Sequence, residues 1–117
     1  MKNNPKFEVI ICIVNSGFSD EVMDAARKAG AKGGTVLRGR GTANPEAESL
    51  FGIAIQPEKE IVMILVESKI KNDILHALYR KVGLNTPGQG IAFSVPALSV
   101  VGLAEKTANT EEKPKEE

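Results

Sequence analysis

The stretch FEVIICIVNSGFSDEVMDAARKAG, residues 7–30, contains the pattern that decides the fold. Its first part, 7–15, is rich in Val and Ile, which predicts a buried β-strand. Apolar residues then recur at helical spacing on one face: Val22, Ala25, Ala26 and Ala29. Ser19 is the predicted N-cap of this helix and Gly30 its stop. A short strand over 34–38 completes a β-α-β unit.

The same order of elements repeats in the second half. Residues 59–67 predict a third strand, and 68–83 predict a second helix whose inward residues are Ile70, Ile74, Leu75, Leu78 and Val82. The run 91–103 predicts a fourth strand, interrupted near Pro96 because proline donates no hydrogen bond to a ladder. Two tandem β-α-β units predict an α+β, ferredoxin-like double βαβ sandwich, a four-stranded antiparallel sheet with two helices on one face. The other face is expected to pack against further copies of the chain.

Length and composition limit the possible functions. The 117 residues predict one domain over 1–103, followed by a charged, flexible tail over 104–117. A formal net charge of zero argues against nucleic acid as a partner. The chain has no apolar run long enough to insert into a membrane. The lone Cys12 is expected in the core and fits a cytoplasmic location.

Catalytic residues are scarce in this chain. His76 is its one histidine and is expected on a helix surface. With one histidine and one cysteine, a structural zinc site is not expected. The sequence has no nucleophile elbow, zinc-protease or P-loop motif. We therefore expect a protein that is not an enzyme, without catalytic residues or a metal site.

Two glycine-bearing segments are candidates for binding an anion. They are Gly39-Arg40-Gly41, after the second strand, and Thr86-Pro87-Gly88-Gln89-Gly90, before the fourth. Glycines let the backbone approach a ligand and turn its N–H groups toward an anion. The charged residues between positions 25 and 45 are all positive: Arg27, Lys28, Lys32, Arg38 and Arg40. Such a patch attracts phosphate, although tight turns beside a solvated face are the alternative.

These segments together resemble the PII nitrogen-regulatory signal-transduction protein family. AGAKGGTVLRGRG (29–41) is similar to the segment that leads into the family's T-loop, the arm that engages partners. NTPGQGIAFSV (85–95) is similar to its B-loop and the strand after it, and PEKEIVMILV (57–66) to its third strand. The resemblance spans 7–103. It places a T-loop at about 39–57 and a B-loop at about 85–91.

The resemblance implies a cytoplasmic homotrimer that takes part in signal transduction. It implies clefts between subunits that bind an adenine nucleotide (ATP, ADP or AMP), and a T-loop that regulates a membrane transporter or a metabolic enzyme. The residues implied near the base are Gly33, Gly34, Thr35 and Val66. Those implied near ribose and phosphates are Gly39, Gly41, Thr86, Gly88, Gln89 and Gly90. Arg38 and Arg40 are further candidates, by their charge, to bind the phosphates. The implied partner-binding residues are Thr42, Asn44, Glu46, Glu48, Leu50 and Phe51.

The chain also departs from the family pattern. Ile91 stands where the family has its B-loop lysine, and Gly102 and Ala104 stand where it has paired arginines. Thr42 and Ala43 replace an arginine and a glutamine, so binding of 2-oxoglutarate is not expected. The predicted arm lacks the tyrosine that is uridylylated in bacterial members, and Tyr79 lies in a helix.

Two other functions remain open at this point. The chain could be a trimeric metal-responsive or structural protein of the same fold that binds no nucleotide. It could also be a small hydrolase of the acyl-phosphate type. In that case Arg38 or Arg40 would bind phosphate, and Asn15 or Asn44 would orient water.

Overall fold

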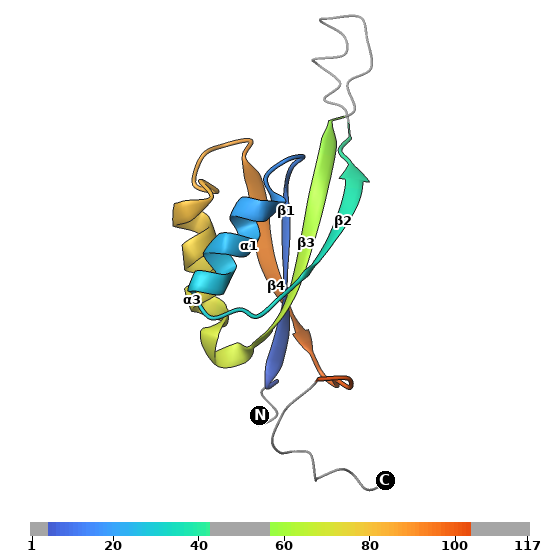
Figure 1. Ribbon diagram of the computed structural model, residues 1–117, viewed down its shortest axis with the longest axis vertical. Helices are drawn as coiled ribbons and strands as arrows, with labels where there is room; N and C mark the ends of the chain where they lie inside the picture. The colour runs from blue at the N-terminus through green and yellow to red at the C-terminus, as the bar shows by residue number, and fades with distance from the viewer. Residues whose placement is uncertain (1–4, 43–56, 104–117) are drawn as a thin grey trace, which may run out of the picture.

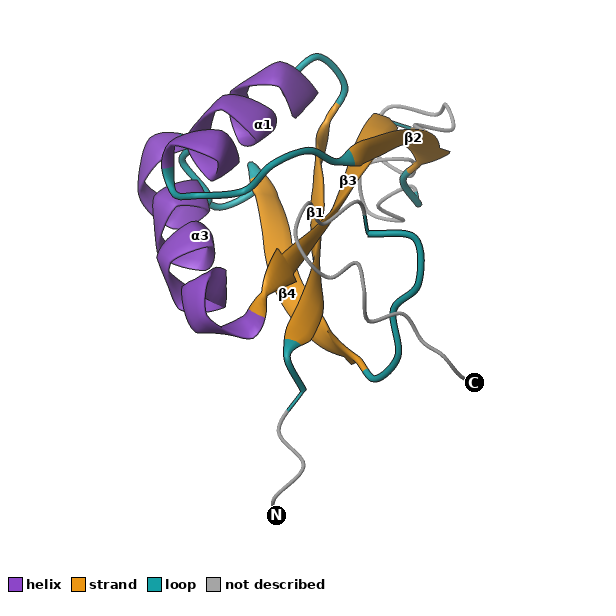
Figure 2. Ribbon diagram, turned by 60° about the horizontal axis from the view of Figure 1, so that its bottom comes forward, coloured by secondary structure: helices purple, strands orange, loops and turns teal. Residues whose placement is uncertain are grey.

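The computed structural model describes residues 5–42 and 57–103. In chain order its elements are β1 (Phe7–Asn15), α1 (Ser19–Lys28), β2 (Thr35–Arg40), β3 (Glu58–Glu67), α3 (Ser68–Lys81) and β4 (Gly90–Ala97). The strands form one antiparallel sheet in the order β2-β3-β1-β4. Both helices cover the same face of it (Figures 1 and 2). The predicted ferredoxin-like α+β sandwich is confirmed.

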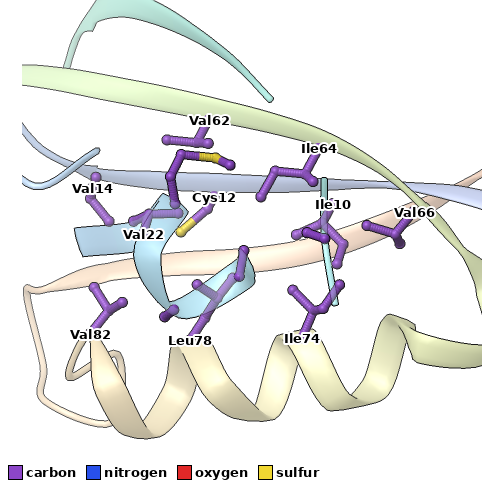
Figure 3. Packing of buried hydrophobic residues seen from close by; sticks show 14 residues of the cluster. Ile10, Cys12, Val14, Val22, Val62, Ile64, Val66, Ile74, Leu78 and Val82 are labelled. Atoms are coloured by element: carbon purple, nitrogen blue, oxygen red, sulfur yellow. The ribbon is translucent and has the colours of Figure 1, made fainter. Parts of the chain in front are cut away.

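The core fills the space between the helices and the sheet (Figure 3). Burial alternates along β1, because successive side chains of a strand point to opposite faces. The fully buried side chains come from both central strands and both helices, with Ile10, Ile64, Val22, Ile74 and Leu78 among them. Cys12 is fully buried in the same cluster, as predicted. Burial raises the pKa of its thiol to about 11, so Cys12 is an uncharged core residue at neutral pH.

The second and fourth strands differ most from the prediction. β4 runs through Pro96 without interruption but ends at Ala97, so the predicted continuation over 98–103 is wrong. It is an edge strand with β1 as its one partner in the sheet, and proline is tolerated where its nitrogen faces away from the ladder. β2 continues past the predicted end to Arg40, because Gly39 and Arg40 pair with the first residues of β3. The connection predicted at 39–57 therefore begins only after β2.

The face of the sheet opposite the helices is apolar. Strand alternation places on it, among others, Val9, Ile11, Leu37, Met63, Phe93 and Val95. Leu37 is 46% exposed, Phe93 41% and Val95 40%. A contiguous apolar surface of this kind is typical of an interface between protein chains.

Candidate functional site

The strand directions bring two predicted loops to one end of the sheet, which we call the upper end. It comprises residues 15–19, 38–41, 58–60 and 83–90, shown near the top of the sheet in Figure 1. β1 and β2 finish there, and β3 and β4 begin there. The Gly39–Gly41 segment and the 83–90 loop thus share one end, but they lie at opposite edges, separated by β3 and β1.

A chain of hydrogen bonds crosses the upper end between these edges. The Lys59 Nζ atom donates to Asn15 Oδ1 at 2.7 Å. Asn15 Nδ2 in turn donates to the carbonyl oxygen of Gly88 at a longer 3.4 Å. Asn15 therefore links the start of β3 to the 83–90 loop. From the sequence, the one role suggested for Asn15 was to orient water in a hydrolase.

Glu60 fixes the start of α1. Its Oε1 atom accepts hydrogen bonds from the backbone N–H groups of Gly17, at 3.1 Å, and Ser19, at 3.0 Å. Ser19 is the first residue of the helix, and no side-chain cap bond is present, so the predicted Ser19 N-cap is wrong. A carboxylate from the neighbouring strand supplies the cap instead.

The Glu60 carboxyl is held in its ionised form. The Ser19 side chain, followed by the backbone N–H groups of Ser19 and Gly17 and the charge of Arg38, lowers the pKa of Glu60. Each of these groups favours the charged carboxylate. The start of α1, a region of positive potential, is thus already occupied by an acidic group of the same chain.

Arg38 and Arg40 pair with glutamates in the register of the ladder. Arg38 is directly opposite Glu60, and Arg40 is directly opposite Glu58. A cavity of about 330 Å³ beside them is lined by Ser16, Arg38, Gly39, Arg40, Glu58 and Lys59. From the sequence, only the positive residues around β2 were apparent. The glutamates opposite them, Glu58 and Glu60, belong to β3, which is distant in the chain.

The glycines of the 83–90 loop have different environments. Gly90 has φ +152°, and a Cβ atom there would lie 2.5 Å from the Ile13 carbonyl oxygen. Gly88 has φ +84° and open space around the Cβ position. The loop approaches β1 so closely at position 90 that only glycine fits there, whereas Gly88 is exposed to solvent. Thr86 and Gln89 complete the loop, which is closed by bonds from the Thr86 N–H to the Gly83 oxygen and from the Gln89 N–H to the Thr86 oxygen.

The residues implied near a base lie at the other end of the sheet. Gly33 and Val66 line a cavity of about 470 Å³ whose apolar wall includes Phe7, Ile70 and Leu103. Gly34 packs closely, since a Cβ atom there would lie 3.0 Å from the Met63 carbonyl oxygen. Thr35 begins β2. A strand rises about 3.3 Å per residue, so roughly 20 Å separates Thr35 from Gly41.

A single chain therefore does not bring the predicted nucleotide-binding residues into one pocket. They form three groups: one beside the lower cavity, one at the end of β2, and one in the 83–90 loop. Thr42 is exposed, and Ile91, the second residue of β4, is 59% exposed. The other predicted T-loop residues, and Ala104, lie outside the described residues: Asn44, Glu46, Glu48, Leu50 and Phe51.

Within residues 5–42 and 57–103, no cluster of three or more His, Cys, Asp or Glu side chains could hold a metal ion. His76 is exposed on α3, as predicted. Among the described helices, none has the length and apolar character that crossing a membrane requires.

In comparisons with known proteins, this chain matches solved structures but no family model and no curated sequence. PII from Arabidopsis thaliana, in a crystal structure bound to citrate, is 21% identical with a TM-score of 0.59; the match covers 83% of this chain and 80% of that one. A protein from Thermus thermophilus that is described as a PII-like signalling protein is 16% identical with a TM-score of 0.60. This match covers 80% of this chain and 87% of that one. The chain has the fold of PII and PII-like signalling proteins, which confirms the predicted resemblance at the level of the fold.

Proposed function

We propose that this chain is a divergent PII-like signalling protein and not an enzyme. It binds a small ligand, in our view an adenine nucleotide, in clefts between the subunits of a homotrimer. The observation that carries the proposal is the shared fold over four fifths of the chain, in two signalling proteins. The end of β2 and the start of β3, which flank the predicted T-loop, lie at the upper end together with the predicted B-loop, and this supports it.

The apolar face of the sheet supports assembly. Neither helix covers this face, and Phe93, Met63 and Leu37 are each more than a third exposed on it. Burial of apolar area contributes roughly 25 cal/mol per Å², so association through this face is favourable. We propose that copies packed in this way bring the lower cavity of one chain toward the upper end of another, so that the three separated groups of predicted residues contribute to one cleft.

Ligand binding is proposed to act through residues 41–57, which follow β2 directly. A ligand that prefers one arrangement of this segment shifts its population and thereby the affinity for a partner. By analogy with the family, the partner is a membrane transporter or a metabolic enzyme in the cytoplasm, and the signal concerns nitrogen status.

The test combines mass and binding. Light scattering after size exclusion should give three times the mass of the chain, and calorimetric titration should give saturable binding of ATP, ADP, AMP or a cyclic nucleotide. Gly88→Ala and Arg40→Ala should weaken binding, whereas Asp73→Asn, on the exposed surface of α3, should not. A monomer would contradict the assembly. No heat with any of these nucleotides would contradict nucleotide sensing.

A further inference from the structure

The upper end has a cluster of cations at one edge of the sheet and a neutral loop at the other. The cavity at the end of β2 is lined by three cations and one carboxylate: Arg38, Arg40, Lys59 and Glu58. Within residues 5–42 and 57–103, none of these cations forms an ion pair. The 83–90 loop contains no charged side chain. A small anion is therefore attracted to the cavity more strongly than to the loop.

Lys59 takes part in both the cavity and the chain of hydrogen bonds that crosses the upper end. The residue lines the cavity, and its Nζ atom donates to Asn15 Oδ1 at 2.7 Å. Both residues are half-buried, and a hydrogen bond with an ionised donor is stronger than one between neutral groups. An ammonium group on a flexible four-carbon stem can also move toward an anion in the cavity. An anion and Asn15 thus compete for the same cation.

Asn15 uses the two ends of one amide group. Its Oδ1 atom accepts from Lys59, while its Nδ2 atom donates to the Gly88 carbonyl oxygen at 3.4 Å. A half-turn of the amide would place its NH₂ group against the ammonium and its oxygen against the carbonyl, so Lys59 fixes the orientation in which Asn15 holds the loop. The bond to Gly88 is the longer and weaker of the two. It is therefore the bond that is lost when Lys59 moves.

The loop is able to respond when this bond is lost. Gly88 is exposed, has φ +84° and has nothing within 4 Å of its Cβ position. Glycine adopts both signs of φ at little cost, so the peptide after Gly88 can turn once its carbonyl oxygen is released. Gly90, in contrast, lies close against the Ile13 carbonyl oxygen. The response is therefore confined to the exposed part of the loop.

We propose that Asn15 is a positioning residue that couples the two parts of the candidate site. An anion bound at the end of β2 draws Lys59 away from Asn15, and Asn15 then releases Gly88. The inference rests on the proposed function, because the cavity and the loop are two parts of the same proposed ligand site. Binding free energies are linked, so the hold of Asn15 on Lys59 in turn weakens anion binding in the cavity.

The test uses inorganic phosphate as the probe and the amide resonances of the protein as the readout. In the wild type, phosphate should shift the signals of Gly39 and Gly41 at the cavity and those of Gly88 and Gln89 in the loop. In Asn15→Ala the shifts at the cavity should remain, and those in the loop should disappear. Loop shifts that persist in Asn15→Ala, or a wild-type loop that does not respond to phosphate, would overturn the inference.

Two substitutions at Asn15 separate its two hydrogen bonds. Asn15→Ala removes the competitor for Lys59 and should raise phosphate affinity about fivefold or more. Asn15→Asp loses the bond to Gly88 as well, but it offers Lys59 a charged acceptor and should lower phosphate affinity. Asn72→Ala and Asn72→Asp, on the exposed surface of α3, are the matched controls and should leave it unchanged.

The direction of the two effects distinguishes coupling from a structural role. Damage to the fold would lower phosphate affinity in both Asn15 variants, and a change in the same direction in both would overturn the inference. The probe is phosphate alone, so a failure of this coupling leaves the proposed function standing. A failure of nucleotide binding or of assembly, measured by calorimetry and light scattering, would contradict the proposed function separately.

Discussion

Replacing Gly90 by alanine should destabilise the fold much more than the same change at Gly88. The two glycines lie in one loop, two residues apart, and both have positive φ. At Gly90 the new Cβ atom would lie 2.5 Å from the Ile13 carbonyl oxygen and 3.0 Å from Val14 Cγ1. At Gly88 the new atom meets nothing within 4 Å.

The expected magnitudes follow from these contacts. A residue with Cβ in a sparsely populated backbone region costs about 1–3 kcal/mol, and an overpacked site costs about 1–3 kcal/mol more. Gly90→Ala should therefore lower the free energy of unfolding by about 2–6 kcal/mol, the sum of the two costs. Gly88→Ala carries only the backbone cost, about 1–2 kcal/mol.

The assay is unfolding in urea at one fixed protein concentration, because the proposed assembly would make stability depend on concentration. Gly33→Ala is the control, since Gly33 has no positive φ and open space at its Cβ position. It should change stability by less than about 0.5 kcal/mol. Equal destabilisation by Gly90→Ala and Gly88→Ala would refute the argument that the loop is pressed against β1 at Gly90.

The result also decides how binding data are interpreted. A loss of ligand binding in a Gly90 variant would report damage to β4, because Gly90 pairs with Val14 at the start of that strand. A loss in Gly88→Ala, with the fold intact, would report the loop itself. For this reason Gly88, rather than Gly90, is the position for tests of the ligand site.

Three further predictions concern the cap, the open face and the core. Glu60→Gln should lower the free energy of unfolding at neutral pH. Because the folded pKa of Glu60 is depressed below 4.5, wild type and variant should converge as pH falls below 4.5, and a constant difference down to pH 3 would contradict the capping role. Phe93→Glu should yield monomers by light scattering, whereas Asn72→Glu on the helix surface should keep the wild-type mass; an unchanged mass for Phe93→Glu would contradict assembly through the open face. Cys12 should resist thiol reagents at pH 8 in the folded protein, since it is buried with a pKa of about 11, and react rapidly in denaturant; rapid reaction without unfolding would contradict its burial.

The elements that the sequence predicted best are those with strong periodicity. The strand over 7–15 was predicted at its observed bounds, and the second helix with its inward residues Ile74, Leu78 and Val82. The prediction at Pro96 failed because the sequence does not state whether a strand lies at an edge. The prediction of a Ser19 cap failed because the competing acceptor, Glu60, comes from a strand 41 positions away.

For the candidate site, the sequence identified the loops and the structure determined their surroundings. The glycine-bearing segments and the basic residues of β2 were visible as local patterns, and the resemblance to PII proteins linked them. The glutamates opposite Arg38 and Arg40 could not be found in this way, because the pairing of β2 with β3 follows from strand register. Lys59, which reaches Asn15 across the same end, gave no local signal either.

Local pattern by itself thus determined the fold of this protein, because apolar periodicity and turn residues act over a few positions and two repeated β-α-β units leave few ways to form a sheet. Only the tertiary structure decided the electrostatics of the upper end and the separation of the predicted site into three groups. Charges and distances of that kind depend on which strands become neighbours, and neighbours in a sheet are set by contacts between residues far apart in the chain.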